Sequence, residues 1–316
     1  MNPIRDALSQ YIQIRRALGT KYQEPSQTLG YFVDFLENEG AEFITTKLAL
    51  RWALQPKNVQ RATWSRRLTM VRKFAAWMST IDPRTQVPSK HLFNVRHRRK
   101  KPYIFSEQQI QLLMTEADRL HCHKGLRPFT YKTFIGLLAA TGLRPGEAIA
   151  LDIDDVDFKN NMLLIRESKF DKSRFVPIAI STTYALSQYA KLRKRICSSP
   201  SSAKAFFISN RCTRLCAYTV RCTFAKLSQN VGLRASAPGK CIGRGPRLQD
   251  LRHTFATRKL IEWYQAGLNV EKELPKLSTY LGHVGVAQTY WYIEAVPELL
   301  HLATEYMAKH GQGGAQ

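Results

Sequence analysis

Several side chains after residue 140 are of the types that act on a phosphodiester bond. Its cleavage needs a nucleophile, neutralisation of the charge that builds on the phosphoryl oxygens, and a proton for the leaving 5′ oxygen. Side chains can meet these needs without a metal when two arginines and further donors converge on one phosphate. The candidates are Arg144, Lys169, Arg252, His283 and Tyr292.

Both arginines stand beside a predicted helix end. Residues 141–147 read Thr-Gly-Leu-Arg-Pro-Gly-Glu, which places Arg144 between a glycine suited to end one helix and Pro145, suited to start the next. Residues 250–257 place Arg252 near another helix start. Spacing alone does not bring them into one site, because an isolated arginine is more often a surface or salt-bridge residue.

The other candidates have neighbours of the same type. Lys169 lies at the tip between two predicted strands, and Lys172 is close enough to be the alternative proton donor. His283 follows a predicted helix, and Tyr292 lies nine residues beyond it. Tyr290 is a second candidate nucleophile on the residues alone.

Taken together, these stretches resemble the motifs of the tyrosine recombinase (phage integrase) family, in the same order and at matching separations. Residues 141–147 resemble that family's first arginine box, and residues 251–257 resemble its second. Residues 280–283 and 289–292 resemble its histidine and nucleophile box. The likeness covers about residues 103–300, and the preceding part resembles the family's core-binding domain more weakly.

The resemblance implies a role for each candidate. Arg144 and Arg252 would grip the non-bridging oxygens, and Lys169 would protonate the leaving 5′ oxygen. His283 would donate a hydrogen bond to the phosphate or orient the nucleophile. Tyr292, favoured over Tyr290 by the family spacing, would form a 3′-phosphotyrosyl link that the exchanged strand can reverse without ATP.

Two further positions complete the comparison with the family. Glu147 matches the acidic residue after the first arginine, and we expect it to support other groups of the site. Gln249 stands where the family usually has a histidine or a lysine. A glutamine can donate a hydrogen bond but cannot carry charge or transfer a proton. Arg247 and Lys240 are candidates to supply the missing charge.

The fold predicted from these patterns is mainly α-helical. Residues 3–19, 26–39, 46–54 and 61–80 predict an all-α, four-helix core-binding domain. The fourth helix has one apolar face, and the opposite face suits contact with phosphates. The residues of that basic face are Arg61, Arg66, Arg67 and Lys73.

The second part is predicted to be an α+β catalytic domain with a small antiparallel sheet. Short alternating stretches around 154–158, 162–166 and 174–178 predict its strands. A capping box at Ser106 and Gln109 opens the first helix. Helices are expected at about 107–119, 129–141, 181–195, 217–231, 248–265, 270–281, 286–291 and 296–309.

We therefore predict a core-binding domain at 1–95, a basic linker at 96–102 and a catalytic domain with a C-terminal tail helix at 103–316. The linker cations expected to contact DNA are Arg98, Arg99, Lys100 and Lys101. The formal net charge is +24, and each side of residue 101 carries an excess of +12. Such a charge favours a polyanionic partner, and we expect double-stranded DNA.

The composition also excludes several classes of protein. The first residues are not a signal peptide, and no stretch is apolar enough to span a bilayer, so we expect a cytoplasmic protein without membrane contact. The six cysteines are expected to be reduced thiols. The spacing of Cys212, Cys216 and Cys222, and of His121-Cys122-His123, fits no common zinc finger. We predict neither a metal nor a cofactor.

Three functions compete at this point. The favoured one is a site-specific recombinase that acts as a homotetramer on DNA, for integration, excision or resolution of a mobile element. The second is a relative that binds DNA in an accessory or regulatory role with impaired catalysis, for which Gln249 is the only argument. The third is an RNA-binding module, which lacks the expected aromatic sheet motif.

The tail after about residue 296 is apolar enough to dock on a neighbouring subunit or on its own domain. On the first alternative, removal of residues 297–316 should harm synapsis and strand exchange more than DNA binding.

Overall fold

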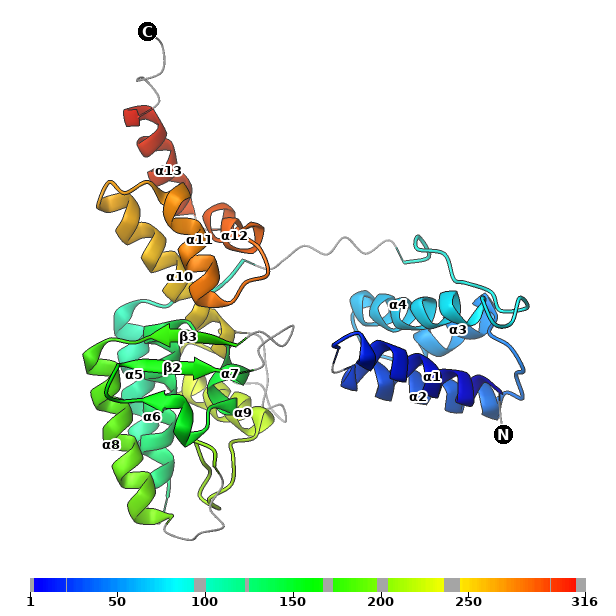
Figure 1. Ribbon diagram of the computed structural model, residues 1–316, viewed down its shortest axis with the longest axis horizontal. Coiled ribbons are helices and arrows are strands. Elements are labelled where there is room, and N and C mark those ends of the chain that lie inside the picture. Colours follow the sequence, from blue (N-terminus) through cyan, green and yellow to red (C-terminus); the bar gives the residue numbers. More distant parts are fainter. Residues whose placement is uncertain are drawn as a thin grey trace. The chain divides into compact units, whose positions relative to one another are not determined.

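The computed structural model describes residues 3–20, 22–93, 101–122, 125–166, 173–197, 204–235, 245–295 and 297–310. The side chains of residues 294–295 and 306–310 are not described. The chain divides into two compact units, Met1–Lys100 and Lys101–Gln316, which are treated separately below (Figure 1).

The first unit contains four helices: α1 (Pro3–Ala17), α2 (Gln23–Asn38), α3 (Thr46–Leu54) and α4 (Arg61–Met78). Each presents an apolar stripe to one shared core, in which Phe32, Trp52 and Phe74 are among the largest buried side chains. Thr45 begins α3 by accepting a hydrogen bond from the backbone N–H of Leu48. The four predicted helices are confirmed.

Arg67 differs from the other cations of α4. Its guanidinium lies 3.7 Å from the centre of the Trp52 ring and donates to the Trp52 carbonyl oxygen at 2.9 Å. Burial lowers the pKa of this arginine below its ordinary value. Arg67 therefore takes part in packing α4 against α3.

Helix α6 (Leu126–Thr141) is the central element of the second unit. It packs against α5, α8 (Ile180–Ile196) and α10 (Leu248–Gln265). Ser106 caps α5 (Glu107–Asp118), and the predicted capping box with Gln109 is present. At the other end of α6, Gly142 has a φ of +62°, and a Cβ there would lie 2.6 Å from the Phe255 ring. The chain needs a glycine at this point for both reasons.

The predicted antiparallel sheet is confirmed. It consists of β1 (Val156–Asp157), β2 (Met162–Ile165) and β3 (Arg174–Pro177), in the order β1-β2-β3. Pairing of Leu163 with Val176 places both on the inner face, where they are fully buried in the main core. Arg174 lies on the same side of β3 as Val176 and forms the cross-strand pair with Ile165.

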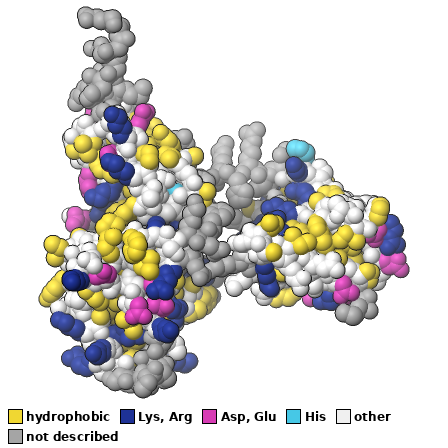
Figure 2. Space-filling model, viewed as in Figure 1, with side chains coloured by type: hydrophobic (Ala, Val, Ile, Leu, Met, Phe, Trp, Pro, Cys, Tyr) yellow, Lys and Arg dark blue, Asp and Glu magenta, His cyan; other side chains and the backbone are white. Residues whose placement is uncertain are grey.

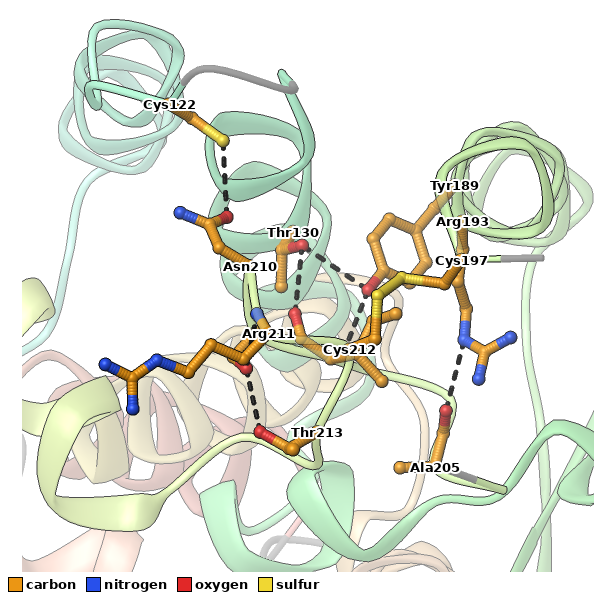
Figure 3. Close-up of a disulfide and its surroundings, with 12 residues drawn as sticks. Cys122, Thr130, Tyr189, Arg193, Cys197, Ala205, Asn210, Arg211, Cys212 and Thr213 are labelled. Carbon is orange, nitrogen blue, oxygen red and sulfur yellow. Dashed lines mark hydrogen bonds between the residues drawn. A yellow bond between two sulfur atoms is a disulfide. The ribbon is translucent and has the colours of Figure 1, made fainter. Parts of the chain in front are cut away.

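One disulfide bond contradicts the expectation that all cysteines are reduced thiols. Cys197 ends α8 (Ile180–Ile196), and it is bonded to Cys212 with a Cα–Cα distance of 6.1 Å (Figure 3). The fold brings the end of α8 beside the 208–214 turn, where the hydroxyl of Tyr189 accepts a hydrogen bond from the backbone N–H of Ile208. Sequence spacing gave no sign of this proximity.

Reduction of Cys197–Cys212 is expected to lower the free energy of unfolding by about 2–3 kcal/mol, because the bond closes a loop in the unfolded chain. Denaturant unfolding with and without dithiothreitol measures the difference. A Cys197→Ser variant, whose stability should not respond to the reductant, is the control. Equal midpoints for the oxidised and reduced wild type would show that the bond does not stabilise the fold.

The remaining helices are α7 (Pro145–Ala150), α9 (Ala217–Asn230), α10 (Leu248–Gln265), α11 (Val270–Leu281), α12 (Ala287–Ala295) and α13 (Pro297–His310), with a short 3-10 turn η1 (Ile153–Asp155). Helices α10–α13 share a small core that includes Leu260, Leu277 and Leu299. Helix α12 is longer than predicted and contains Tyr292. Among the described helices, none is long and apolar enough to cross a membrane.

Candidate active site

Arg144 lies between the end of α6 and the start of α7. Its Nη1 donates to Glu147 Oε1 at 2.7 Å, and its backbone N–H donates to Glu147 Oε2 at 3.0 Å. Its Nη2 donates to the carbonyl oxygen of Gly282 at 2.9 Å. These contacts hold the guanidinium in place, while the side chain as a whole stays about one-quarter exposed.

Arg252 lies in the first turns of α10 and is almost fully buried. Its Nη1 donates to the Gly142 carbonyl oxygen at 2.9 Å, and its Nη2 donates to the Leu281 carbonyl oxygen at 2.7 Å. Burial and the nearby charge of Arg144 lower the pKa of Arg252 to about 10. It therefore still carries its positive charge at neutral pH.

Arg174 is a third guanidinium at this site, and the sequence reasoning did not identify it. Its Nη1 and Nη2 donate to the two oxygens of Glu147 at 3.1 and 3.0 Å, and its Nε donates to the Tyr280 carbonyl oxygen at 2.9 Å. A signal was available in the strand pattern. A cation on the same face as buried Val176 requires a partner inside the protein.

The last turn of α11 joins the three arginines. Its successive carbonyl oxygens, at residues 280, 281 and 282, accept hydrogen bonds from Arg174, Arg252 and Arg144. Carbonyl groups at a helix C-terminus have no partner within the helix and carry partial negative charge, so they attract cations. Helix α11 thereby gathers guanidiniums from β3, from α10 and from the α6–α7 turn.

Glu147 balances part of this charge. Its carboxylate is buried, which alone would raise its pKa, but the hydrogen bonds and charges of Arg174 and Arg144 outweigh burial and leave the pKa below its ordinary value. The carboxylate is therefore ionised. It supports other groups of the site, as the sequence predicted.

The two residues of the nucleophile box lie just beyond this turn. The ring of Tyr292, on α12, is buried and lies parallel to the His283 ring, with centroids 6.1 Å apart. The His283 Nδ1 lies 2.8 Å from the Thr289 hydroxyl oxygen. Tyr292 also contacts His253 and Trp291, at centroid distances of 5.4 and 5.6 Å. Tyr290, the alternative nucleophile, is exposed.

Both histidines beside Tyr292 are neutral at pH 7. Burial, with further contributions from Arg252 and Arg144, lowers the pKa of His283 to about 3. Burial also lowers the pKa of His253 to about 4, although the Asp250 carboxylate opposes the shift. A neutral imidazole can donate one hydrogen bond and accept another, but it adds no cation to the site.

We expect stability to fall as the pH is lowered from 7 to 5. The unfolded chain takes up protons on both histidines near pH 6.5, while the folded chain keeps them neutral, so protonation favours unfolding. Each histidine contributes at most about 1.4 kcal/mol per pH unit. Urea unfolding at several pH values measures the slope, which should be shallower in a His253→Gln, His283→Gln double variant. An unchanged slope in that variant would contradict the shifts.

Gln249 lies one turn before Arg252 at the start of α10. It lines a cavity of about 380 Å³ together with Pro145 and Gly146 from the start of α7. Arg247 lines the same cavity but is paired with the Asp250 carboxylate at 3.0 Å. Gln249 therefore lies beside the start of α7, the helix that follows Arg144.

Several predicted residues lie elsewhere or outside the described part of the chain. Lys169, Lys172 and Lys240 fall outside the described residues, so their roles remain predictions. Most of the predicted linker does too, including Arg98, Arg99 and Lys100, whereas Lys101 is exposed. In the first unit, Arg61, Arg66 and Lys73 are exposed, and Arg66 is paired with Glu24 at 2.5 Å.

Cationic side chains are spread over the visible surface of both units (Figure 2). Exposed arginines and lysines of this kind suit contact with a polyanion. Cys212 is held in the disulfide, so it is not available as a metal ligand beside Cys216 and Cys222. Within the described residues, no group of three or more His, Cys, Asp or Glu side chains could hold a metal ion.

Three guanidiniums, a neutral histidine and a buried tyrosine around one helix end form a site suited to phosphoryl transfer. The sequence profile of the phage integrase family matches residues 104–298. The chain belongs to this family, the tyrosine recombinases.

Two relatives agree with this assignment, and one solved structure has a similar fold. The chain is 43% identical to the integrase/recombinase y4rB of Sinorhizobium fredii (strain NBRC 101917 / NGR234) over 303 residues, which is 95% of each chain. It is 34% identical to y4rE of the same organism, over 95% of this chain and 94% of that protein. The fold is similar to that of the Tn1549 transposon integrase in complex with transposon right end DNA, with a TM-score of 0.65, 16% identity and coverage of 98% and 99%.

Proposed function

We propose that the protein is an active site-specific DNA recombinase that cleaves and rejoins strands through a 3′-phosphotyrosyl intermediate at Tyr292. The observation that carries the proposal is the convergence of Arg144 and Arg252 on the last turn of α11, directly before His283 and close to Tyr292. Within the described residues, this site combines two anchored cations with a nucleophile suited to a phosphodiester.

Each group has a chemical task in this proposal. Arg144 and Arg252 bind the non-bridging oxygens and stabilise the charge that develops on them. The Tyr292 hydroxyl gives up its proton to solvent as its oxygen attacks phosphorus. Its bond to phosphorus forms as the bond to the 5′ oxygen breaks, and Lys169 supplies the proton to that oxygen. His283 and Gln249 donate neutral hydrogen bonds to the phosphate. Attack by a 5′ hydroxyl on the phosphotyrosine reverses the step.

A nicked suicide duplex tests the proposal. The probe is a duplex selected by binding from a random pool and nicked beside the cleavage position, so that the released short strand diffuses away and religation fails. Covalent protein–DNA adduct on a denaturing gel is the expected result. Specific binding to the duplex without any adduct would instead support the accessory DNA-binding relative that Gln249 suggests.

The partner that we propose is a double-stranded recombination site bound by a homotetramer. The net charge of +24 and the exposed cations of the first unit, which we take as the core-binding domain, support DNA as the partner. The Tn1549 integrase structure contains transposon end DNA. By this similarity we propose integration, excision or resolution of a mobile element as the biological role.

The tail helix bears on the assembly. In the described residues, α13 packs against α10 and α12 of its own domain, with Leu299 fully buried and Leu300 exposed. Removal of residues 297–316 would uncover this part of the core, so it is no clean test of subunit contacts. Truncation after residue 305 keeps Leu299 in place and is the better way to probe a role of the tail in synapsis.

A further inference from the structure

Arg174 makes more contacts with the site than its position on an edge strand requires. Its side chain is only 12% exposed, and three of its nitrogens donate to two different elements. Two of them occupy both oxygens of Glu147 on α7, while the third holds the carbonyl oxygen of Tyr280 on α11. A lysine could not reproduce this planar, three-donor geometry.

The charges explain why these contacts matter for Arg144. Glu147 accepts from both Arg144 and Arg174, so one negative charge is shared by two guanidiniums. If Arg174 were neutral, both carboxylate oxygens would be available to Arg144, and the two groups would form a neutral pair. With Arg174 present, the three groups Arg144, Arg174 and Glu147 together keep a net positive charge. A phosphate beside Arg144 then meets a cation whose charge the Glu147 carboxylate does not cancel.

The backbone contact adds a geometric constraint. Gly282 has a φ of +66°, and a Cβ on this residue would lie only 2.6 Å from Arg174 Nη1. The guanidinium thus packs directly against the turn whose other carbonyl oxygens hold Arg252 and Arg144. A shift of Arg174 would move the acceptors of both arginines.

We propose that Arg174 is a positioning residue for phosphoryl transfer. It occupies both carboxylate oxygens of Glu147 and holds the last turn of α11 in place. Arg144 thereby keeps its positive charge and its direction toward the scissile phosphate. This role rests on the proposed recombinase function. Arg174 itself does not contact the phosphate. Its removal should therefore matter most when the phosphate carries its full negative charge.

The test compares two nicked duplexes, one with an ordinary scissile phosphate and one with an uncharged methylphosphonate at that position. Arg174→Gln is expected to slow single-turnover strand cleavage of the phosphate duplex by about tenfold to a hundredfold. It should slow cleavage of the methylphosphonate duplex much less, because that substrate has less need of a cation. Arg174→Lys should recover part of the loss by restoring charge without the bidentate contact.

Arg214→Gln is the matched control. Arg214 also donates to a carboxylate, on Asp152, and to two carbonyl oxygens, of Ile149 and Leu151, but it does not contact Glu147. Any loss of rate in this variant should be equal on both duplexes. Thermal unfolding shows which variants are folded. If Arg174→Gln does not fold, the comparison of the two duplexes is made with Arg174→Lys.

The outcomes separate this proposal from the function on which it rests. A wild-type protein that binds the duplex but cleaves neither substrate removes the recombinase function. A wild type that cleaves, together with Arg174 variants that are unaffected or equally slow on both duplexes, removes only the role of Arg174.

Discussion

Tyr292→Phe is expected to abolish covalent adduct formation while DNA binding persists. Phenylalanine keeps the ring that packs against His283 and His253 but lacks the oxygen that attacks phosphorus. Loss of a covalent nucleophile lowers the rate by more than about a thousandfold. Single-turnover reaction with the nicked duplex measures the rate, and a mobility-shift assay measures binding.

Tyr290→Phe is the natural control for this experiment. Tyr290 has the same side chain, lies two residues away on α12, and is 43% exposed, whereas Tyr292 is 2% exposed. We expect nearly wild-type adduct formation from Tyr290→Phe. Adducts formed by Tyr292→Phe, and lost in Tyr290→Phe, would reassign the nucleophile.

Arg252→Gln is expected to have the second largest effect, with losses in both rate and stability. Removal of one preorganised cation at a developing charge typically costs about a hundredfold or more in rate. The substitution also removes the charged donor from the carbonyl oxygens of Gly142 and Leu281, which lowers the free energy of unfolding by about 1–3 kcal/mol. Adduct formation and urea unfolding measure the two losses separately.

Arg252→Lys distinguishes the contribution of the positive charge from that of the donor geometry. A lysine keeps the charge but can reach only part of the donor geometry, so a folded Arg252→Lys variant should remain slow. A wild-type cleavage rate in either folded variant would contradict the assignment of Arg252 to the phosphate.

The elements of the fold were predictable because local signals agree with the tertiary structure. The capping box at Ser106 and the glycine after α6 fixed helix ends that the structure confirms. Helix α12 was predicted too short, at 286–291. Its residues have weak periodicity, and no glycine or proline interrupts the chain between Ala287 and Pro297, so the helix runs through Tyr292.

The site was only partly predictable, because its contacts cross between elements that are distant in the sequence. Arg144, Arg252, His283 and Tyr292 were named from motifs, and the structure brings them together around the end of α11. Arg174 belongs to no such motif. The strand pattern indicates that Arg174 needs a partner inside the protein, but its contact with Tyr280 spans 106 residues, and no local pattern identifies that partner. The Cys197–Cys212 bond joins residues only 15 apart, and it was missed because a chain without a signal peptide was expected to keep its thiols reduced.

In the recombinase proposed above, the last turn of α11 holds Arg144 and Arg252 before DNA is bound. Both long side chains lose their rotational freedom as the chain folds. Binding of DNA therefore does not have to include the entropic cost of ordering them. The acceptors and donors of these contacts all belong to one polypeptide. On that proposal, a single folded chain orients both guanidiniums before any second copy has arrived.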